Sequence, residues 1–170
     1  MRINKTKSKN KEHYSIIRDI NKNGKRTTCI YENIGNLEKL KQRAGDMEPI
    51  EWLNNYVKDL NEVVTHFLVD HPQVHVNNND NSIPYVINFS VRGVTSHRVV
   101  DLLNQKGIYL SSKTSCCPLE APSKLVYAMT RDNSLAASSI RLSLSYLTTP
   151  DEIEEFEDAF DEVLNEIMGV

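Results

Sequence analysis

The feature that most restricts the fold is the helix predicted at the C-terminal end. Its start, Thr149-Pro150-Asp151-Glu152, has the order of a capping box with proline at the first helical position. Apolar residues then recur at helical spacing on one face only, at Ile153, Phe156, Phe160, Val163, Leu164 and Ile167. A helix that is apolar on a single face needs a second layer against which that face is buried.

Short strands with one-sided helices between them supply such a layer. Apolar alternation and flanking turn residues predict strands at 74–76, 83–91, 108–110 and 140–144. Helical spacing and capping residues predict helices at 49–69, from Thr95 or Ser96 to Gly107, and at 122–129. The predicted fold class is therefore α/β, as an α+β two-layer sandwich.

The first part of the chain predicts a β-hairpin and a connecting helix. Two β-prone runs, residues 14–17 and 27–31, flank Asn23-Gly24, a dipeptide typical of type I′ hairpin turns. A short helix is expected over 37–43, and the helix of residues 49–69 then leads into the sandwich.

The two ends of the chain differ sharply in charge. Residues 1–45 contain 12 Lys/Arg against 4 Asp/Glu, whereas residues 46–170 contain 8 against 19. This asymmetry fits either two pieces of separate origin or one domain with a basic arm. Residues 2–26 are either a salt-sensitive contact for nucleic-acid phosphates or a solvated basic hairpin without a partner.

Several classes of protein are excluded by composition. With 39% hydrophobic and 25% charged residues the chain is typical of globular proteins, and no apolar run approaches the roughly 20 residues of a membrane span. The basic N-terminus lacks the apolar core of a signal peptide, so a cytoplasmic protein is expected. The three cysteines have neither the spacing of a disulfide framework nor the histidine partners of a metal site.

Cys116 and Arg141 are the candidate functional residues. Cys116 lies in a Ser/Thr/Lys loop after a predicted strand, and nearby Lys113 would favour its thiolate form. On these residues alone, the simpler interpretation that Cys116 or Cys117 is a small buried apolar group is not overturned. Arg141 lies in a predicted strand, where it can bind a carboxylate or pair with a glutamate of the last helix.

Five motifs in register give these residues a family context. They are 82–90 (SIPYVINFS), 107–117 (GIYLSSKTSCC), Pro122-Ser123 before an apolar helix, 138–143 (SSIRLS) and 147–153 (LTTPDEI). Together they resemble the C-terminal small domain of a pyridoxal-phosphate cysteine desulfurase of the class V aminotransferase family. The resemblance covers residues 61–170 and implies the small domain of a fold-type I enzyme. It implies that Cys116 is the persulfide-carrying nucleophile and that Arg141 holds the substrate's α-carboxylate.

The resemblance also implies pyridoxal phosphate, held in the family by a lysine directly after a histidine in a large upstream domain. The desulfurase-like part has four lysines, none of which follows a histidine: Lys58, Lys106, Lys113 and Lys124. No cofactor-binding residue is therefore assigned, and the chain is expected to be inactive alone. An intact desulfurase subunit or a sulfur acceptor is the expected partner. Self-association is expected as well, because small domains of this family pack on a large domain.

Residues 1–60 resemble a different family, the start of a DDE-type insertion-sequence transposase. The likeness rests on residues 1–10, 14–17, 24–28 and 43–52. Three hypotheses therefore stay open. The chain is a fusion remnant of two genes, a sulfur-relay protein that accepts persulfide sulfur on Cys116, or a small basic DNA-binding module.

Overall fold

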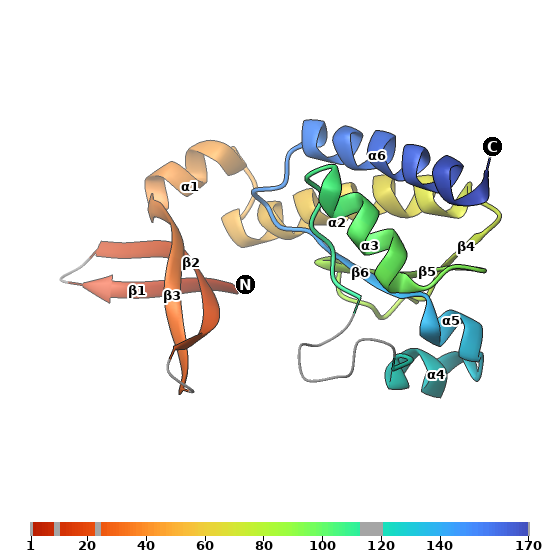
Figure 1. Ribbon diagram of the computed structural model, residues 1–170. Coiled ribbons are helices and arrows are strands. Elements are labelled where there is room, and N and C mark those ends of the chain that lie inside the picture. The colour runs from red at the N-terminus through yellow and green to blue at the C-terminus, as the bar shows by residue number, and fades with distance from the viewer. Residues whose placement is uncertain (1, 9–10, 23–24, 113–120, 170) are drawn as a thin grey trace. The chain divides into compact units, whose positions relative to one another are not determined.

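The computed structural model describes residues 2–8, 11–22, 25–112 and 121–169 (Figure 1). The chain divides into two compact units, Met1–Leu53 and Asn54–Val170, and each is described by itself. The second unit carries both candidate residues.

The first unit is built on an antiparallel sheet with strand order β1-β2-β3, followed by helix α1 (Leu37–Ala44). Its strands are β1 (Arg2–Ser8), β2 (Lys11–Lys22) and β3 (Lys25–Asn36). Lys22 pairs with Lys25, which confirms the hairpin predicted around residues 23–24. Strand β1 was not predicted, because its polar and basic residues show no apolar face.

Helix α2 (Pro49–Val69) has the predicted bounds and leads into the second unit. Its start is held by the Glu48 carboxylate, which accepts hydrogen bonds from the backbone N–H groups of Ile50 and Glu51 at 2.8 and 3.2 Å. Its buried face consists of Leu53, Val57, Leu60, Val64 and Leu68. These residues repeat at helical spacing, so the sequence pattern and the burial agree.

The second unit contains an antiparallel sheet with strand order β4-β5-β6. The strands are β4 (Val74–Val76), β5 (Val86–Val91) and β6 (Ser139–Ser143). Ile87 pairs with Leu142 and Phe89 with Ile140, and all four side chains are buried in the main core. The alternate residues of β5 and β6 therefore lie on the other side of the sheet, which we call the open face.

Helices α2, α3 (Ser96–Gln105) and α6 (Pro150–Met168) form the layer that covers the buried face (Figure 1). This arrangement confirms the two-layer α+β prediction. The predicted capping box is also present. The Thr149 N–H donates to the Glu152 carboxylate at 2.9 Å, and the Glu152 N–H donates to the Thr149 hydroxyl at 3.2 Å.

Phe160 lies at the centre of this core and is fully buried. Its ring centroid is 5.5 Å from that of Phe156, 5.7 Å from Phe89 and 6.0 Å from Phe67. These contacts join α2, the sheet and α6. His71 adds a polar link between the same helices, because its ring nitrogens lie 2.9 Å from the Phe67 carbonyl and 2.7 Å from the Asp161 carboxylate.

Two short helices, α4 (Lys124–Thr130) and α5 (Asn133–Ala137), form a separate apolar cluster of Val126, Leu135 and Ala136. Asp132 caps α5, which was not predicted. Hydrogen bonds from the backbone N–H groups of Leu135 and Ser134, together with the Arg92 guanidinium, hold the pKa of this carboxyl below its usual range. The cap explains how so short a helix starts, since it satisfies two N–H groups of the first turn.

Two strand predictions need correction. Strand β5 begins at Val86 rather than at 83, because the Val86 N–H closes a turn onto the Ile83 carbonyl. Residues 108–110 form no strand. The Ile108 and Gly107 N–H groups donate to the Leu103 and Asn104 carbonyls, which completes a Schellman motif at the end of α3 and removes Ile108 from the sheet. A groove of about 240 Å³ separates 107–110 from 142–144.

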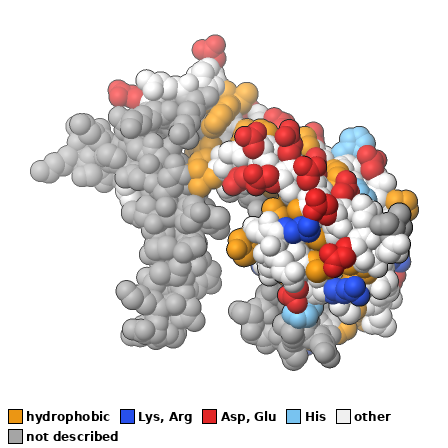
Figure 2. Space-filling model, turned by 45° about the horizontal axis from the view of Figure 1, so that its top comes forward, with side chains coloured by type: hydrophobic (Ala, Val, Ile, Leu, Met, Phe, Trp, Pro, Cys, Tyr) orange, Lys and Arg blue, Asp and Glu red, His pale blue; other side chains and the backbone are white. Residues whose placement is uncertain are grey.

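The exposed side of the helix layer is strongly acidic (Figure 2). Partial burial, and then the negative charges of Glu154, Asp161 and Asp158, raise the pKa of Glu157.

Among the described residues, no helix has the length and the apolar character that a bilayer crossing requires.

Candidate functional site

The candidate site is built on the open face of the sheet, where β6 presents Arg141. The neighbours of Arg141 in the strand, Ile140 and Leu142, are buried against the helices, whereas Arg141 itself is exposed. Alternation along the strand therefore directs Arg141 away from α6. In the described part of the chain Arg141 forms no ion pair, so the pairing with a glutamate of the last helix is not seen there.

Ser111 connects this strand to the cysteine loop. The Arg141 N–H donates to the Ser111 carbonyl at 2.7 Å, and the Ser111 N–H donates to the Arg141 carbonyl at 3.1 Å. The two residues form an isolated antiparallel bridge on the outer edge of β6. Cys116, Cys117 and Lys113 lie in residues 113–120, outside the residues that the structure describes.

Polar side chains share the open face with Arg141. Asn88 is its register partner on β5, and Ser90 pairs with Ser139 two residues further along the two strands. Asn77, Ser90 and Ser139 are buried although they are polar, because α5 lies against this part of the open face and its Leu135 carbonyl accepts from the Ser90 hydroxyl. A network of hydrogen bonds joins these residues. This face therefore differs in character from the buried face, which is entirely apolar.

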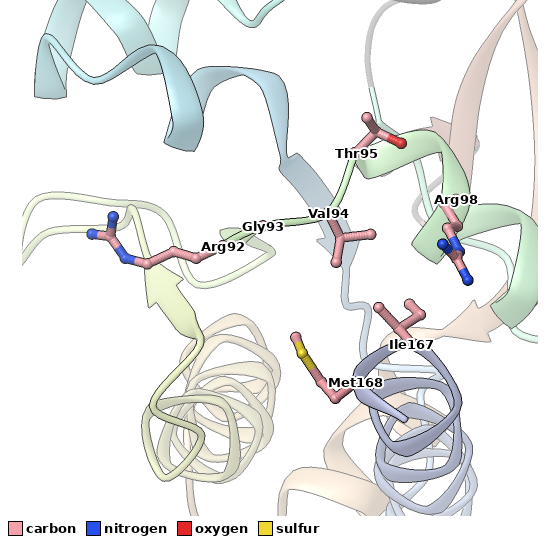
Figure 3. Close-up of a pocket in the computed structure, with 7 residues that line it drawn as sticks. All are labelled: Arg92, Gly93, Val94, Thr95, Arg98, Ile167 and Met168. Atoms are coloured by element: carbon pink, nitrogen blue, oxygen red, sulfur yellow. The ribbon is translucent and has the colours of Figure 1, made fainter. Parts of the chain in front are cut away.

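The pocket in Figure 3 does not have the geometry of a site in which arginines bind an anion. Two apolar side chains from the end of α6, Ile167 and Met168, face Val94 across it. Its two arginines diverge, since Arg92 extends toward Asp132, at 3.6 Å, while Arg98 lies over Ile167. Two guanidinium groups that point apart cannot clasp one anion in the bidentate manner typical of arginine sites.

The described residues of the second unit do not fit pyridoxal phosphate. The cofactor needs a lysine amine, and Lys58 and Lys106 both belong to the helix layer, where they pair with Glu62 and Glu162. The remaining described lysine of the unit, Lys124, is exposed at the start of α4. Within the same described residues no group of three or more His, Cys, Asp or Glu side chains is placed to hold a metal ion.

Residues 21–156 match the aminotransferase class-V family. The chain belongs to this family. The match begins within residues 1–60, so part of the segment compared above with a transposase also lies inside the class-V match.

Relatives of this class-V chain include two curated bacterial proteins. A NifS/IcsS protein homolog of Lactobacillus delbrueckii subsp. bulgaricus is 27% identical over 107 residues, which are 61% of this chain and 28% of the relative. The cysteine desulfurase IscS of Buchnera aphidicola subsp. Baizongia pistaciae is 30% identical over 101 residues, which are 59% of this chain and 25% of the relative. The chain thus corresponds to about a quarter of the length of these relatives.

A solved structure agrees with this assignment. The NifS-like protein of Rickettsia africae has a TM-score of 0.60 and 26% identity, over 68% of this chain and 30% of that protein. The chain therefore contains a cysteine desulfurase-like class-V domain, and 68% of the chain has the fold of the matching part of that protein. Membership of the family implies pyridoxal phosphate as the cofactor of the complete enzymes.

Sequence reasoning named Arg141 but missed Ser111 and Asn88 as its neighbours. The signal for Asn88 was present, because it alternates with Ile87 and Phe89 in the clearest predicted strand and so had to lie on the polar face. The contact with Ser111 depends on where residues 108–112 run, and no local pattern fixes that path.

Proposed function

We propose that the chain is a cysteine desulfurase-like domain in which Cys116 carries sulfur as a persulfide and Arg141 binds the α-carboxylate of cysteine. The observation that carries the proposal is the bridge between Ser111 and Arg141. Cys116 follows Ser111 by five residues, and such a length of chain spans at most about 17 Å. This short chain distance between Cys116 and the residue bonded to Arg141 supports the proposal that the two act at one site.

The division of labour follows from the chemistry of the two groups. The planar guanidinium of Arg141 is exposed and has no side-chain partner among the described residues, which suits bidentate capture of a carboxylate. A thiolate is the nucleophilic form of cysteine, so Cys116 is the group that takes up sulfur. We also propose that the desulfurase-like domain begins near residue 60.

We expect no desulfurase turnover by this chain alone, because its 170 residues contain no lysine directly after a histidine. The measurement is sulfide release from L-cysteine by the purified chain with added pyridoxal phosphate, together with the visible absorbance of protein-bound cofactor. Neither signal should exceed that of a blank without protein, while an intact desulfurase gives both. Steady sulfide release that scales with the concentration of the chain would refute the expectation.

Sulfur relay is the second candidate function, and the lack of a fitting lysine among the described residues favours it. In this step the Cys116 thiolate attacks the outer sulfur of a persulfide on a donor protein such as an intact desulfurase. A new S–S bond forms to Cys116, the donor's S–S bond breaks, and the donor cysteine leaves as a thiolate. The step needs neither cofactor nor oxidant.

A contact between residues 2–26 and DNA, and the transposase-like origin of residues 1–60, are separate proposals that rest on sequence and charge. If residues 2–26 contact phosphates, affinity for duplex DNA should fall about tenfold or more between roughly 50 and 200 mM salt. Lys25→Glu should weaken this binding, whereas the matched change Lys124→Glu in the second unit should not. Affinity that is unchanged by salt contradicts phosphate contact.

A further inference from the structure

We propose that Asn88 supplies a second hydrogen-bond donor, beside the Arg141 guanidinium, for the α-carboxylate of an amino-acid ligand. The inference rests on the proposed function, because it concerns the same carboxylate. Asn88 is half-buried on the open face and is the register partner of Arg141.

The backbone shows that these two side chains are close neighbours. Both backbone groups of Arg141 bond to Ser111 on the outer edge of β6. The backbone groups of Asn88 are used on the opposite side, where its carbonyl accepts from the Asn77 N–H at 2.7 Å and its N–H donates to the Asn78 side chain at 2.6 Å. Asn88 and Arg141 are therefore a non-hydrogen-bonded antiparallel pair, the kind in which facing side chains approach most closely.

The orientation of the Asn88 amide is set by a carbonyl in another element. The Leu135 carbonyl of α5 can only accept, so the Ser90 hydroxyl, 2.8 Å away, must donate its hydrogen there. The Ser90 oxygen can then only accept from Asn77, whose side-chain nitrogen lies at 2.9 Å. Asn77 is thereby forced to present its NH₂ group to the network.

The orientation of Asn77 in turn fixes the orientation of the Asn88 amide on the open face. The Asn77 nitrogen donates its other hydrogen to Asn88 Oδ1 at 2.9 Å, which fixes Oδ1 as the inward atom of Asn88. Asn88 Nδ2 then has two hydrogens, one of which reaches the Ser139 hydroxyl at 3.1 Å, while that hydroxyl donates to Asn88 Oδ1 at 3.2 Å. The second has no partner among the described residues, on the face where Arg141 lies.

This orientation of the Asn77 and Asn88 amides costs the fold some stability. With both hydrogens of its nitrogen in use, Asn77 leaves its own Oδ1 buried, and that oxygen has no hydrogen-bond partner within the described part of the chain. A buried acceptor without a partner is destabilising and uncommon. An apolar open face would avoid this cost, so the network fits a site whose donor direction matters more than stability.

An NMR titration of the ¹⁵N-labelled chain tests the inference. The probe is L-alanine, an amino-acid carboxylate without a thiol, and L-alaninamide is the control without a carboxylate. Alanine should shift the Asn88 Nδ2–H and Arg141 Nε–H signals together, and alaninamide should shift neither. A shift of Arg141 without Asn88 overturns the inference and leaves the proposed function in place. No shift of Arg141 contradicts the proposed function itself.

Asn88→Asp is the sharpest variant, because it keeps an inward oxygen for Asn77 and replaces the outward N–H by a carboxylate oxygen. The apparent Kd for alanine should rise about fivefold or more in Asn88→Asp and about tenfold or more in Arg141→Gln. Ser143→Ala, an exposed change on the same strand, should stay within about twofold. Wild-type affinity in Asn88→Asp overturns the inference. If that variant fails to fold, the wild-type Asn88 signal decides.

Discussion

Phe160→Ala is expected to destabilise the second unit by about 3–5 kcal/mol, the range found when a buried aromatic ring is removed from a packed core. Phe160 is fully buried, and its ring meets those of Phe67, Phe89 and Phe156 from α2, the sheet and α6. Its removal leaves a cavity where three elements meet, so no single neighbour can fill it. The loss is a large part of the roughly 5–15 kcal/mol typical of a domain.

Urea unfolding, followed by far-ultraviolet circular dichroism, measures the change in the free energy of unfolding. Leu125→Ala is the matched control, because it also truncates a large apolar helix residue but one that is 71% exposed. It should change the free energy of unfolding by no more than about 0.5 kcal/mol. A loss below about 1 kcal/mol for Phe160→Ala would mean that the aromatic cluster is not packed as described.

The parts of the fold that sequence predicted are those with strong local signals. Helix α6 combines a capping box with a one-sided apolar stripe, and α2 has an apolar repeat over its whole length, so neither depends on distant residues. Residues 108–110 show the opposite case. They are apolar enough for a strand, but the end of α3 takes the Ile108 N–H for its own cap.

The candidate site likewise has one part that local sequence patterns predict and one part that they do not. The position of Arg141 on the open face follows from strand alternation, whereas the role proposed for it rests on family resemblance. The amide orientation of Asn88 was out of reach, because it is set through Asn77 and Ser90 by the Leu135 carbonyl, far along the chain. Short-range patterns place side chains on faces, whereas hydrogen-bond direction is a property of the assembled network.

Cys116→Ser is expected to abolish sulfur uptake from a persulfide donor, because a hydroxyl cannot form the S–S bond that holds the transferred sulfur. The chain is incubated with a persulfidated desulfurase or a small persulfide, and peptide mass spectrometry measures the gain of one sulfur atom on the cysteine peptide. Labelling of that peptide should fall about tenfold or more in Cys116→Ser.

Cys117→Ser is the matched control, since the two cysteines are adjacent and share the same charged and polar loop residues. It should keep most of the uptake of the unmodified chain. Loss of labelling in Cys117→Ser but not in Cys116→Ser would transfer the nucleophile's role to Cys117 and break the register of the family resemblance. Equal labelling in both variants would mean that the persulfide reacts with any exposed thiol. In that case the loop has no selective sulfur chemistry, and the relay function fails with it.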